Sequence, residues 1–200
     1  MKEIVYGTTN PAKVAQLSSV LKPLGFEVKS LADFSIQTIV EEDGETAEEN
    51  ARKKAISYAK AIGKSVLSMD DGLYFNDLPD EQQPGLHIRR IKGSELSSDA
   101  EILAYYADLT KSLGGRADVY LRYAFALSRP DGDCVSFSHD TPRIFVSTPS
   151  NTVIKGFPLA SLGVDPLSGK YISEMSTDEM ANFWQSTIGT PLAKFIQENY

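Results

Sequence analysis

The chain has little of what disulfide-bonded, zinc-binding and membrane-spanning proteins are built from. Cys134 is its only cysteine, which excludes an intrachain disulfide and a cysteine-based zinc cluster. His87 and His139 are its only imidazoles. No apolar run approaches the roughly 20 residues of a membrane span, and residues 1–6 predict a first strand rather than a signal peptide. We therefore expect a soluble, cytoplasmic protein.

Basic charge is also scarce, since the formal net charge is −7 at pH 7. This balance argues against broad binding to nucleic acid or to anionic membranes, because both require basic surfaces. It does not exclude a small anionic ligand, since a metal ion and a few local lysines outweigh the global charge. The 200 residues suit one domain, which we place at 1–200.

Strand patterns and helix patterns alternate along the chain, which favours an α/β fold. A Pro-Asp-Gly turn at 130–132 predicts a hairpin, so the sheet is expected to be mixed and twisted, with helices flanking it. We expect the middle of the chain to form a smaller lobe, with a central cleft. The patterns predict strands at 4–6, 26–28, 65–69, 73–75, 117–128, 134–137 and 143–147. They predict a first helix from Pro11 up to Gly25, a second that follows the cap Thr46 and ends at Gly63, and a third from Ser98 or Asp99 to about Leu113. Two further helices are expected to begin at Thr177 and at Pro191.

The turn Thr8-Thr9-Asn10 lies between the first strand and the first helix. Free amide groups and the helix dipole make such a helix start a natural anion site, and Lys13 lies one turn further on. An ordinary N-cap with a solvated lysine is the alternative.

An acidic loop at 41–45 precedes the second helix, in which a capping box joins Thr46 and Glu49. The loop is either a metal-binding segment or a solvated acidic surface. Of the two lysines that follow, Lys54 shares a helix face with residues 50 and 58 and is the better candidate to point inward. Lys53 is the expected surface lysine.

Paired carboxylates at Asp70-Asp71 follow the apolar run 65–69. Strand ends in α/β sheets are where ligands bind, and adjacent carboxylates repel unless they share a cation or a proton. One is suited to holding Mg²⁺ and the other to activating water. The alternative is an acidic turn opened by Asp-Gly. The aromatic residues near the C-terminus, Trp184 among them, are either base-stacking surfaces or core.

Together these segments resemble the inosine triphosphate pyrophosphatase family, also called Ham1-like. Three motifs carry most of the resemblance: Thr8–Lys13 matches Ser/Thr-x-Asn-x-x-Lys, Glu42–Ala55 matches Glu-x-Gly-x-Thr-x-x-Glu-Asn-Ala-x-x-Lys-Ala, and Met69–Leu73 answers Asp-Asp-Ser-Gly-Leu. Weaker matches follow in family order at Pro84–Arg90, Tyr123–Gly132, Leu162–Pro166 and Glu174–Met175.

The resemblance implies a two-lobed α/β fold, usually as a homodimer, and Mg²⁺-dependent hydrolysis of nucleoside triphosphates to monophosphate and pyrophosphate. It further implies a preference for deaminated purines such as those of ITP, dITP and XTP, which cleans the nucleotide pool. Its catalytic residues would be Asp70, Lys13 and Lys54. Substrate would be bound by Thr8, Thr9, Asn10, Lys13, Asp165, Lys170 and Trp184, and the metal by Glu42, Asp70 and Asp71.

The chain departs from the family pattern at several positions. Met69 occupies the place of the first acidic residue of the pair, and Asp71 falls where the family has Ser or Thr. Met180 stands for a lysine, and residues 184–186 stand for Ser-His-Arg. The loop before Asp165 lacks a Pro-Arg-Gly, which leaves Lys155 or Lys170 to hold phosphate from that side.

These departures keep two alternatives open besides a pyrophosphatase with altered base selectivity. One is a catalytically weakened nucleotide-binding or regulatory protein on the same scaffold. The other is a hydrolase of a different modified or pyrimidine nucleotide, with Trp184 as a stacking surface in place of polar recognition.

Overall fold

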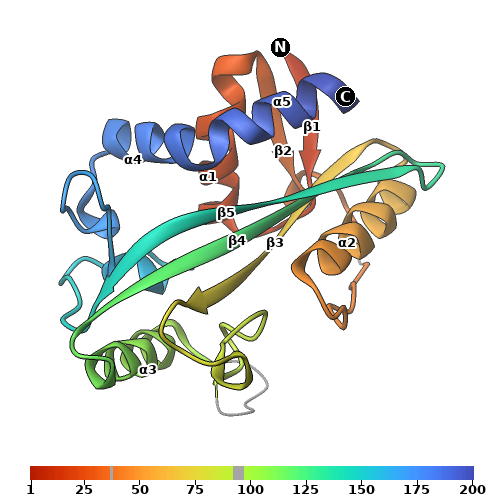
Figure 1. The fold of residues 1–200 in the computed structure, drawn as a ribbon. Coiled ribbons are helices and arrows are strands. Elements are labelled where there is room, and N and C mark those ends of the chain that lie inside the picture. Colours follow the sequence, from red (N-terminus) through yellow and green to blue (C-terminus); the bar gives the residue numbers. More distant parts are fainter. Residues whose placement is uncertain (37, 92–96) are drawn as a thin grey trace. The chain divides into compact units, whose positions relative to one another are not determined.

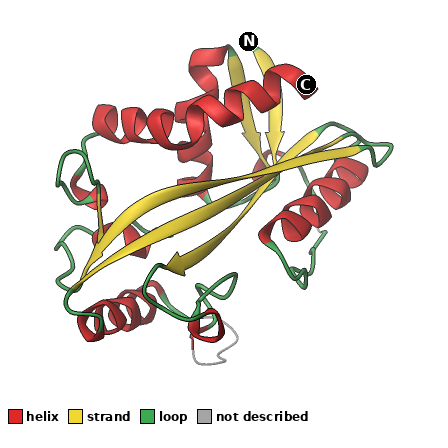
Figure 2. Ribbon diagram, in the orientation of Figure 1, coloured by secondary structure: helices red, strands yellow, loops and turns green. Residues whose placement is uncertain are grey.

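A computed structural model describes residues 1–36, 38–91 and 97–200 (Figure 1). The α/β class predicted from the sequence is confirmed: one sheet has the strand order β2-β1-β3-β4-β5-β6, with helices beside it (Figure 2). The sheet is mixed, because β1 pairs in parallel with β2 and β3 whereas β5 and β6 are antiparallel. None of the helices in the described part of the chain is long and apolar enough to cross a membrane.

The strands are β1 (Lys2–Tyr6), β2 (Phe26–Ser30), β3 (Val66–Phe75), β4 (Arg116–Ser128), β5 (Cys134–Val146) and β6 (Gly163–Val164). The α-helices are α1 (Pro11–Leu21), α2 (Ala47–Ile62), α3 (Asp99–Ser112), α4 (Thr177–Trp184) and α5 (Thr190–Asn199). Short 3₁₀ turns lie at Lys22–Leu24, Leu31–Asp33, Asp80–Gln82, Pro158–Ser161 and Ile172–Glu174, and a π-helical turn lies at Gln185–Gly189.

The chain divides into two compact units, and the boundaries between them fall within β3, β4, β5 and α4. Unit 1 comprises residues 1–71, 123–139 and 181–200, and unit 2 comprises residues 72–122 and 140–180. In unit 2 the core lies between α3 and the strands, and its fully buried members include Leu73, Phe75, Ile102, Tyr106 and Phe145.

Unit 1 begins with a β-α-β segment in which α1 packs against β2 (Figure 1). The sequence offers Asn10 or Thr9 as the N-cap of α1; the N-cap is Asn10, whose side chain accepts a hydrogen bond from the Ala12 amide at 2.9 Å. The first 3₁₀ turn ends at Gly25, whose φ of +85° lets the chain reverse into β2. The parallel register of β1 and β2 runs from Lys2↔Phe26 to Tyr6↔Ser30.

Helix α2 is held on the sheet of unit 1 by its first two turns. Glu48 accepts hydrogen bonds from the hydroxyls of Ser136 and Ser138 on β5, at 2.8 and 3.0 Å. Arg52 donates to the Cys134 carbonyl and to Ser136, both at 3.0 Å. Because these contacts fix the rotation of α2 about its axis, they also fix which of its residues face the interior.

The capping box predicted at the start of α2 is only half formed. The Thr46 hydroxyl accepts from the Glu49 amide at 3.1 Å, as expected. The Glu49 carboxylate, however, accepts from the amide of Glu45 at 2.8 Å and not from that of Thr46. The acidic loop is thereby attached to the helix one residue earlier than the motif indicates.

Two predicted strand breaks are wrong. The segments 65–69 and 73–75 form the single strand β3, and 134–137 and 143–147 form the single strand β5. The acidic residues at both of these positions have cationic partners on other elements. Asp140 in β5, for example, is bound by both Arg122 Nε and Nη2 of β4 at 2.7 Å. Paired in this way, a carboxylate is compatible with an extended strand.

Pro191 starts the last helix without separating it sharply from α4. Residues 185–189 form a π-helical turn between α4 and α5, and Pro191 lies in the first turn of α5. A proline has no N–H to donate, so it disturbs the hydrogen bonding of the preceding turn, and the wider turn accommodates this loss.

Candidate functional site

Strand β3 continues past the point where β1 ends. The two strands pair only at Val5↔Val66 and Tyr6↔Leu67, and the last link is a 2.8 Å hydrogen bond from the Gly7 amide to the Leu67 carbonyl. Beyond this link the chain after β1 turns away into α1. The turn at 8–10 and the carboxylates at 70–71 therefore lie beyond the carboxyl end of β1, which is where α/β sheets bind ligands.

The turn into α1 depends on a close approach between two strands. A Cβ added at Gly7 would lie 2.2 Å from Ser68 Oγ, so only glycine fits without a shift. The Thr8 hydroxyl accepts from the Asn10 amide at 3.1 Å, and Thr9 is exposed. The predicted residues Thr8, Thr9 and Asn10 thus shape the amino end of α1.

Lys13, one turn into α1, binds a carboxylate of β3. Its Nζ lies 2.7 Å from Asp71 Oδ1, and the two side chains are 24% and 23% exposed. Burial acts to lower the pKa of Lys13, but Asp71 and the nearby Tyr6 outweigh it, so the pKa is raised above its ordinary value. Lys13 is therefore a fixed positive charge.

Lys54 points inward and joins two carboxylates, which confirms the choice of Lys54 over Lys53. Its Nζ lies 2.9 Å from Glu42 Oε1 and 3.0 Å from Asp70 Oδ1, and its side chain is only 9% exposed. Lys53 points outward instead and pairs with Asp43 at 2.7 Å. Burial raises the pKa of Asp70, while the Lys54 ammonium opposes the rise.

The acidic loop is fixed to α2 by Asn50, which the sequence interpretation did not include in the site. Asn50 is buried, and its Oδ1 accepts from the Gly44 amide at 2.8 Å. A Cβ at Gly44 would lie 2.6 Å from the same oxygen. Both residues belong to the Glu42–Ala55 motif, and this motif is the feature of the sequence that points to them. This contact positions the backbone next to Glu42.

The two aspartates of β3 serve different helices. Successive side chains of a strand point to opposite faces, and accordingly Asp70 binds Lys54 of α2 whereas Asp71 binds Lys13 of α1. The charges nevertheless act on one another, because Asp71 and Glu42 both raise the pKa of Asp70, and Asp70 raises that of Lys13. The residues predicted near 13, 42, 54 and 70–71 thus form one charged cluster within unit 1.

Three predicted substrate-binding residues have other partners. Asp165 accepts hydrogen bonds from the amides of Leu167 and Ser168 in its own loop of unit 2, and Lys170 pairs with Glu179 at 2.7 Å. Trp184 of unit 1 is 8% exposed and packs edge-on against Tyr123. For Trp184 this agrees with the alternative that the aromatic residues belong to the core.

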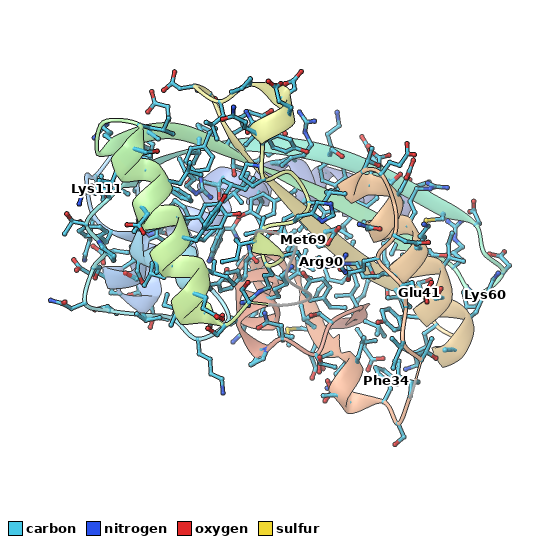
Figure 3. All side chains as sticks on the ribbon, turned by 90° about the horizontal axis from the view of Figure 1, so that it is seen from below. Phe34, Glu41, Lys60, Met69, Arg90 and Lys111 are labelled. Atoms are coloured by element: carbon cyan, nitrogen blue, oxygen red, sulfur yellow. The ribbon has the colours of Figure 1, made fainter. Side chains whose placement is uncertain are left out.

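The carboxylates at 42, 70 and 71 are oxygen ligands of the kind that a hard cation prefers, provided that a bound phosphate supplies further oxygens. Among the described residues, no group of three or more acidic, histidine or cysteine side chains is placed to hold one metal ion. Glu42 and Asp70 do share one cation, the Lys54 ammonium. Mg²⁺ is usually bound by one or two carboxylates together with water and substrate phosphates, so this pair fits such a site. Met69 cannot add a ligand, because its side chain is apolar and buried (Figure 3).

The fold and this cluster define an α/β protein with lysines and carboxylates gathered at the carboxyl end of a parallel strand pair. The chain belongs to the Ham1 family, whose sequence profile matches residues 4–182.

Curated relatives and solved structures are similar over nearly the whole chain. A dITP/XTP pyrophosphatase of Bacillus subtilis is 31% identical over 184 residues, covering 90% of this chain and 88% of the relative. One from an Exiguobacterium species is 33% identical over 181 residues, with the same coverage. The crystal structure of a nucleoside-triphosphatase / dITP/XTP pyrophosphatase from Mycobacterium abscessus has a TM-score of 0.68 at 26% identity, covering 96% of this chain and 98% of that one. The Ham1 protein of Staphylococcus aureus has the same fold, with a TM-score of 0.72 at 24% identity over 100% of both chains.

Proposed function

We propose that this protein is a Mg²⁺-dependent nucleoside triphosphate pyrophosphatase. It releases pyrophosphate and a nucleoside monophosphate, with ITP, dITP and XTP as the expected substrates and an altered base selectivity. Membership of the Ham1 family and the names of its dITP/XTP pyrophosphatase relatives support the proposal. The observation that carries it is the cluster in which Lys13 and Lys54 each bind a carboxylate of β3.

The amino end of α1 and the two lysines provide the polyphosphate site. Thr8, Thr9 and Asn10 surround the helix start, whose amides and dipole favour an anion. Lys13 and Lys54 neutralise the charge that develops on the transferring group and on the departing pyrophosphate.

Asp70 is the residue that orients and deprotonates the attacking water. The water oxygen bonds to the α-phosphorus, and the bond from that phosphorus to the bridging oxygen of the β-phosphate breaks. Burial raises the pKa of Asp70, which makes its carboxylate a better proton acceptor, while the Lys54 ammonium opposes the rise. Of the three proposed metal ligands, Glu42 and Asp70 form the pair that would hold Mg²⁺ in this geometry, whereas Asp71 faces α1; the ion when bound would supply charge neutralisation at the phosphate oxygens.

The remaining assignments rest on the family resemblance. They are contact of Asp165, Lys170 and Trp184 with the substrate, a homodimer, and a cytoplasmic location. Binding of nucleic acid is not part of the proposal, because the net charge is −7.

Pyrophosphate release from a panel of nucleoside triphosphates with Mg²⁺ tests the proposal. The panel contains ITP, dITP, XTP, the four common ribonucleotides and modified pyrimidine nucleotides. We expect the highest kcat/KM with a deaminated purine. Absence of turnover throughout the panel would refute the proposal.

Two alternatives give different results in the same panel. Tight binding without turnover would indicate a nucleotide-binding protein, an alternative motivated by the buried Met69 where the family has an acidic residue. A maximum of kcat/KM with a modified pyrimidine would indicate a hydrolase of another nucleotide.

A further inference from the structure

Helix α2 carries a tyrosine beside the cluster that has no part in the site as described above. Tyr58 lies one turn beyond Lys54 on the same helix face. Its ring packs against a small apolar core whose buried members are Val5, Ala59 and Val66. The residue as a whole is only half-buried. Tyr58 is therefore anchored by its ring, while part of the residue stays open to solvent.

Two neighbours place Tyr58 next to both parts of the site. The edge of its ring lies against Gly7, the residue before the turn at 8–10, because a Cβ added at Gly7 would lie 3.1 Å from Tyr58 Cδ2. The carboxylate of Glu42 is near as well: burial raises the pKa of Tyr58, and the charge of Glu42 raises it further. The phenol therefore borders both the turn that would bind an anion and a carboxylate that would hold the cation.

The α2 side of the site has few hydrogen-bond donors to offer a polyphosphate. A terminal phosphate group has three strong acceptor oxygens. The Lys54 ammonium has three N–H groups, but Glu42 and Asp70 already share it at 2.9 and 3.0 Å. A bound phosphate is therefore stabilised by any further donor on this side. A phenol suits this position because it adds a donor without adding a charge.

We propose that Tyr58 is a further substrate-binding residue, whose hydroxyl donates a hydrogen bond to a phosphate oxygen of the polyphosphate. This inference rests on the proposed function and deepens it, because it adds a neutral donor from α2 to the two lysines. Burial and the nearby Glu42 both disfavour the phenolate and keep the pKa of Tyr58 above its ordinary value. The hydroxyl is therefore protonated at neutral pH and available as a donor.

The competing explanation is that Tyr58 only fills space. Its ring covers Gly7 and packs on the apolar core, and this role needs no hydroxyl. The variant Y58F separates the two explanations, because phenylalanine keeps the ring and removes only the donor. If the ring alone matters, Y58F behaves as the unsubstituted protein does.

The first measurement is calorimetric binding of inorganic tripolyphosphate in the presence of saturating Mg²⁺. We expect Y58F to bind it about tenfold more weakly than the unsubstituted protein, which is the loss typical of one hydrogen bond to a charged group. Y105F is the matched control, because it removes the hydroxyl of another half-buried tyrosine, on α3 in unit 2. We expect Y105F to keep the full affinity. Equal affinities of Y58F and Y105F would overturn the inference.

The second measurement repeats this titration with Y58L, which lacks both the hydroxyl and the ring. We expect Y58L to unfold at lower urea concentration than Y58F, because the aromatic packing is lost, and to show the same loss of affinity for tripolyphosphate as Y58F. A loss of affinity that appears only with Y58L would assign the effect to the ring and refute the hydrogen bond.

The unsubstituted protein separates failure of this inference from failure of the proposed function. If it binds no tripolyphosphate with saturating Mg²⁺, the polyphosphate site itself is wrong and the assignment of Tyr58 is refuted with it. If it binds tripolyphosphate and Y58F binds equally well, the site stands and only the role of Tyr58 is refuted.

Discussion

Asn50 accepts a hydrogen bond from the Gly44 amide at 2.8 Å, and this contact ties the acidic loop to the helix that carries Lys54. The same helix is fixed on β5 by Glu48 and Arg52. One rigid element therefore positions both a lysine of the site and the loop containing Glu42. The geometry of the site consequently depends on residues that need not touch a ligand.

Loosening this loop is expected to weaken activity more than stability. In N50A the partly buried amide of Gly44 loses its partner, at a cost of about 0.5–1.5 kcal/mol in the free energy of unfolding. Because Glu42 then loses its fixed position, we expect the Mg²⁺ concentration needed for half-maximal activity to rise, with kcat lower at saturation. Urea unfolding and a Mg²⁺ titration of pyrophosphate release measure the two effects.

The control for N50A is A51G, which weakens the same turn of α2 without touching the loop. Glycine in a helix costs up to about 1 kcal/mol relative to alanine. If A51G shifts the Mg²⁺ requirement as much as N50A does, the effect comes from the stability of the helix and not from the loop.

Asp70→Asn is expected to nearly abolish turnover while leaving the fold intact. The substitution removes the group that accepts the proton of water, and loss of such a group lowers kcat by about 10²–10⁴-fold. Lys54 keeps Glu42 as its partner, and burial disfavours the charge of Asp70, so the melting temperature should change little. Steady-state pyrophosphate release and thermal unfolding test this. Full activity of D70N would show that another group is the base. The matched control is D43N, which removes a carboxylate from the exposed loop.

Local features of this site were predictable from the sequence, and contacts between distant residues were not. Asn10 as N-cap and the inward direction of Lys54 both follow from local rules, one for caps and one for helical spacing. The break predicted at Asp70-Asp71 is wrong because those carboxylates are paired with lysines 16 and 58 residues away, and no local signal shows such pairing. The same limit explains why Asn50 was not included, since its role depends on where Gly44 lies.

Glu179 links the start of α4 to Lys170 and is expected to make stability depend on pH. Hydrogen bonds, first from the Lys170 ammonium and then from the Ser176 amide, lower its pKa from 4.5 to about 2. Because the pKa of Glu179 is lower in the folded than in the unfolded protein, its contribution to the free energy of unfolding is complete above the unfolded value of 4.5. This contribution disappears as the pH falls toward 2.

The comparison of E179Q with the unsubstituted protein tests this dependence. We expect the difference in free energy of unfolding between them to be constant above about pH 5 and to shrink steadily at lower pH. D178N is the control, because it removes a neighbouring charge and leaves these hydrogen bonds in place. A difference that does not vary with pH would show that the charge of Glu179 does not contribute to stability.

Gly7 and Ser68 offer a direct test of the close approach that turns the chain into the site. A Cβ at Gly7 would lie 2.2 Å from Ser68 Oγ but 3.4 Å from Ser68 Cβ. G7A should therefore destabilise the protein by about 1–3 kcal/mol, as overpacking does.

Ser68 Oγ is buried and has no hydrogen-bond partner among residues 1–36, 38–91 and 97–200, so S68A alone is expected to be neutral or stabilising. In the double variant the clashing oxygen is gone, and most of the stability should return. Urea unfolding of the four proteins gives the coupling energy. If G7A costs the same with and without the Ser68 hydroxyl, the cost comes from another contact of the added Cβ, such as that with Tyr58 Cδ2 at 3.1 Å, and not from this one.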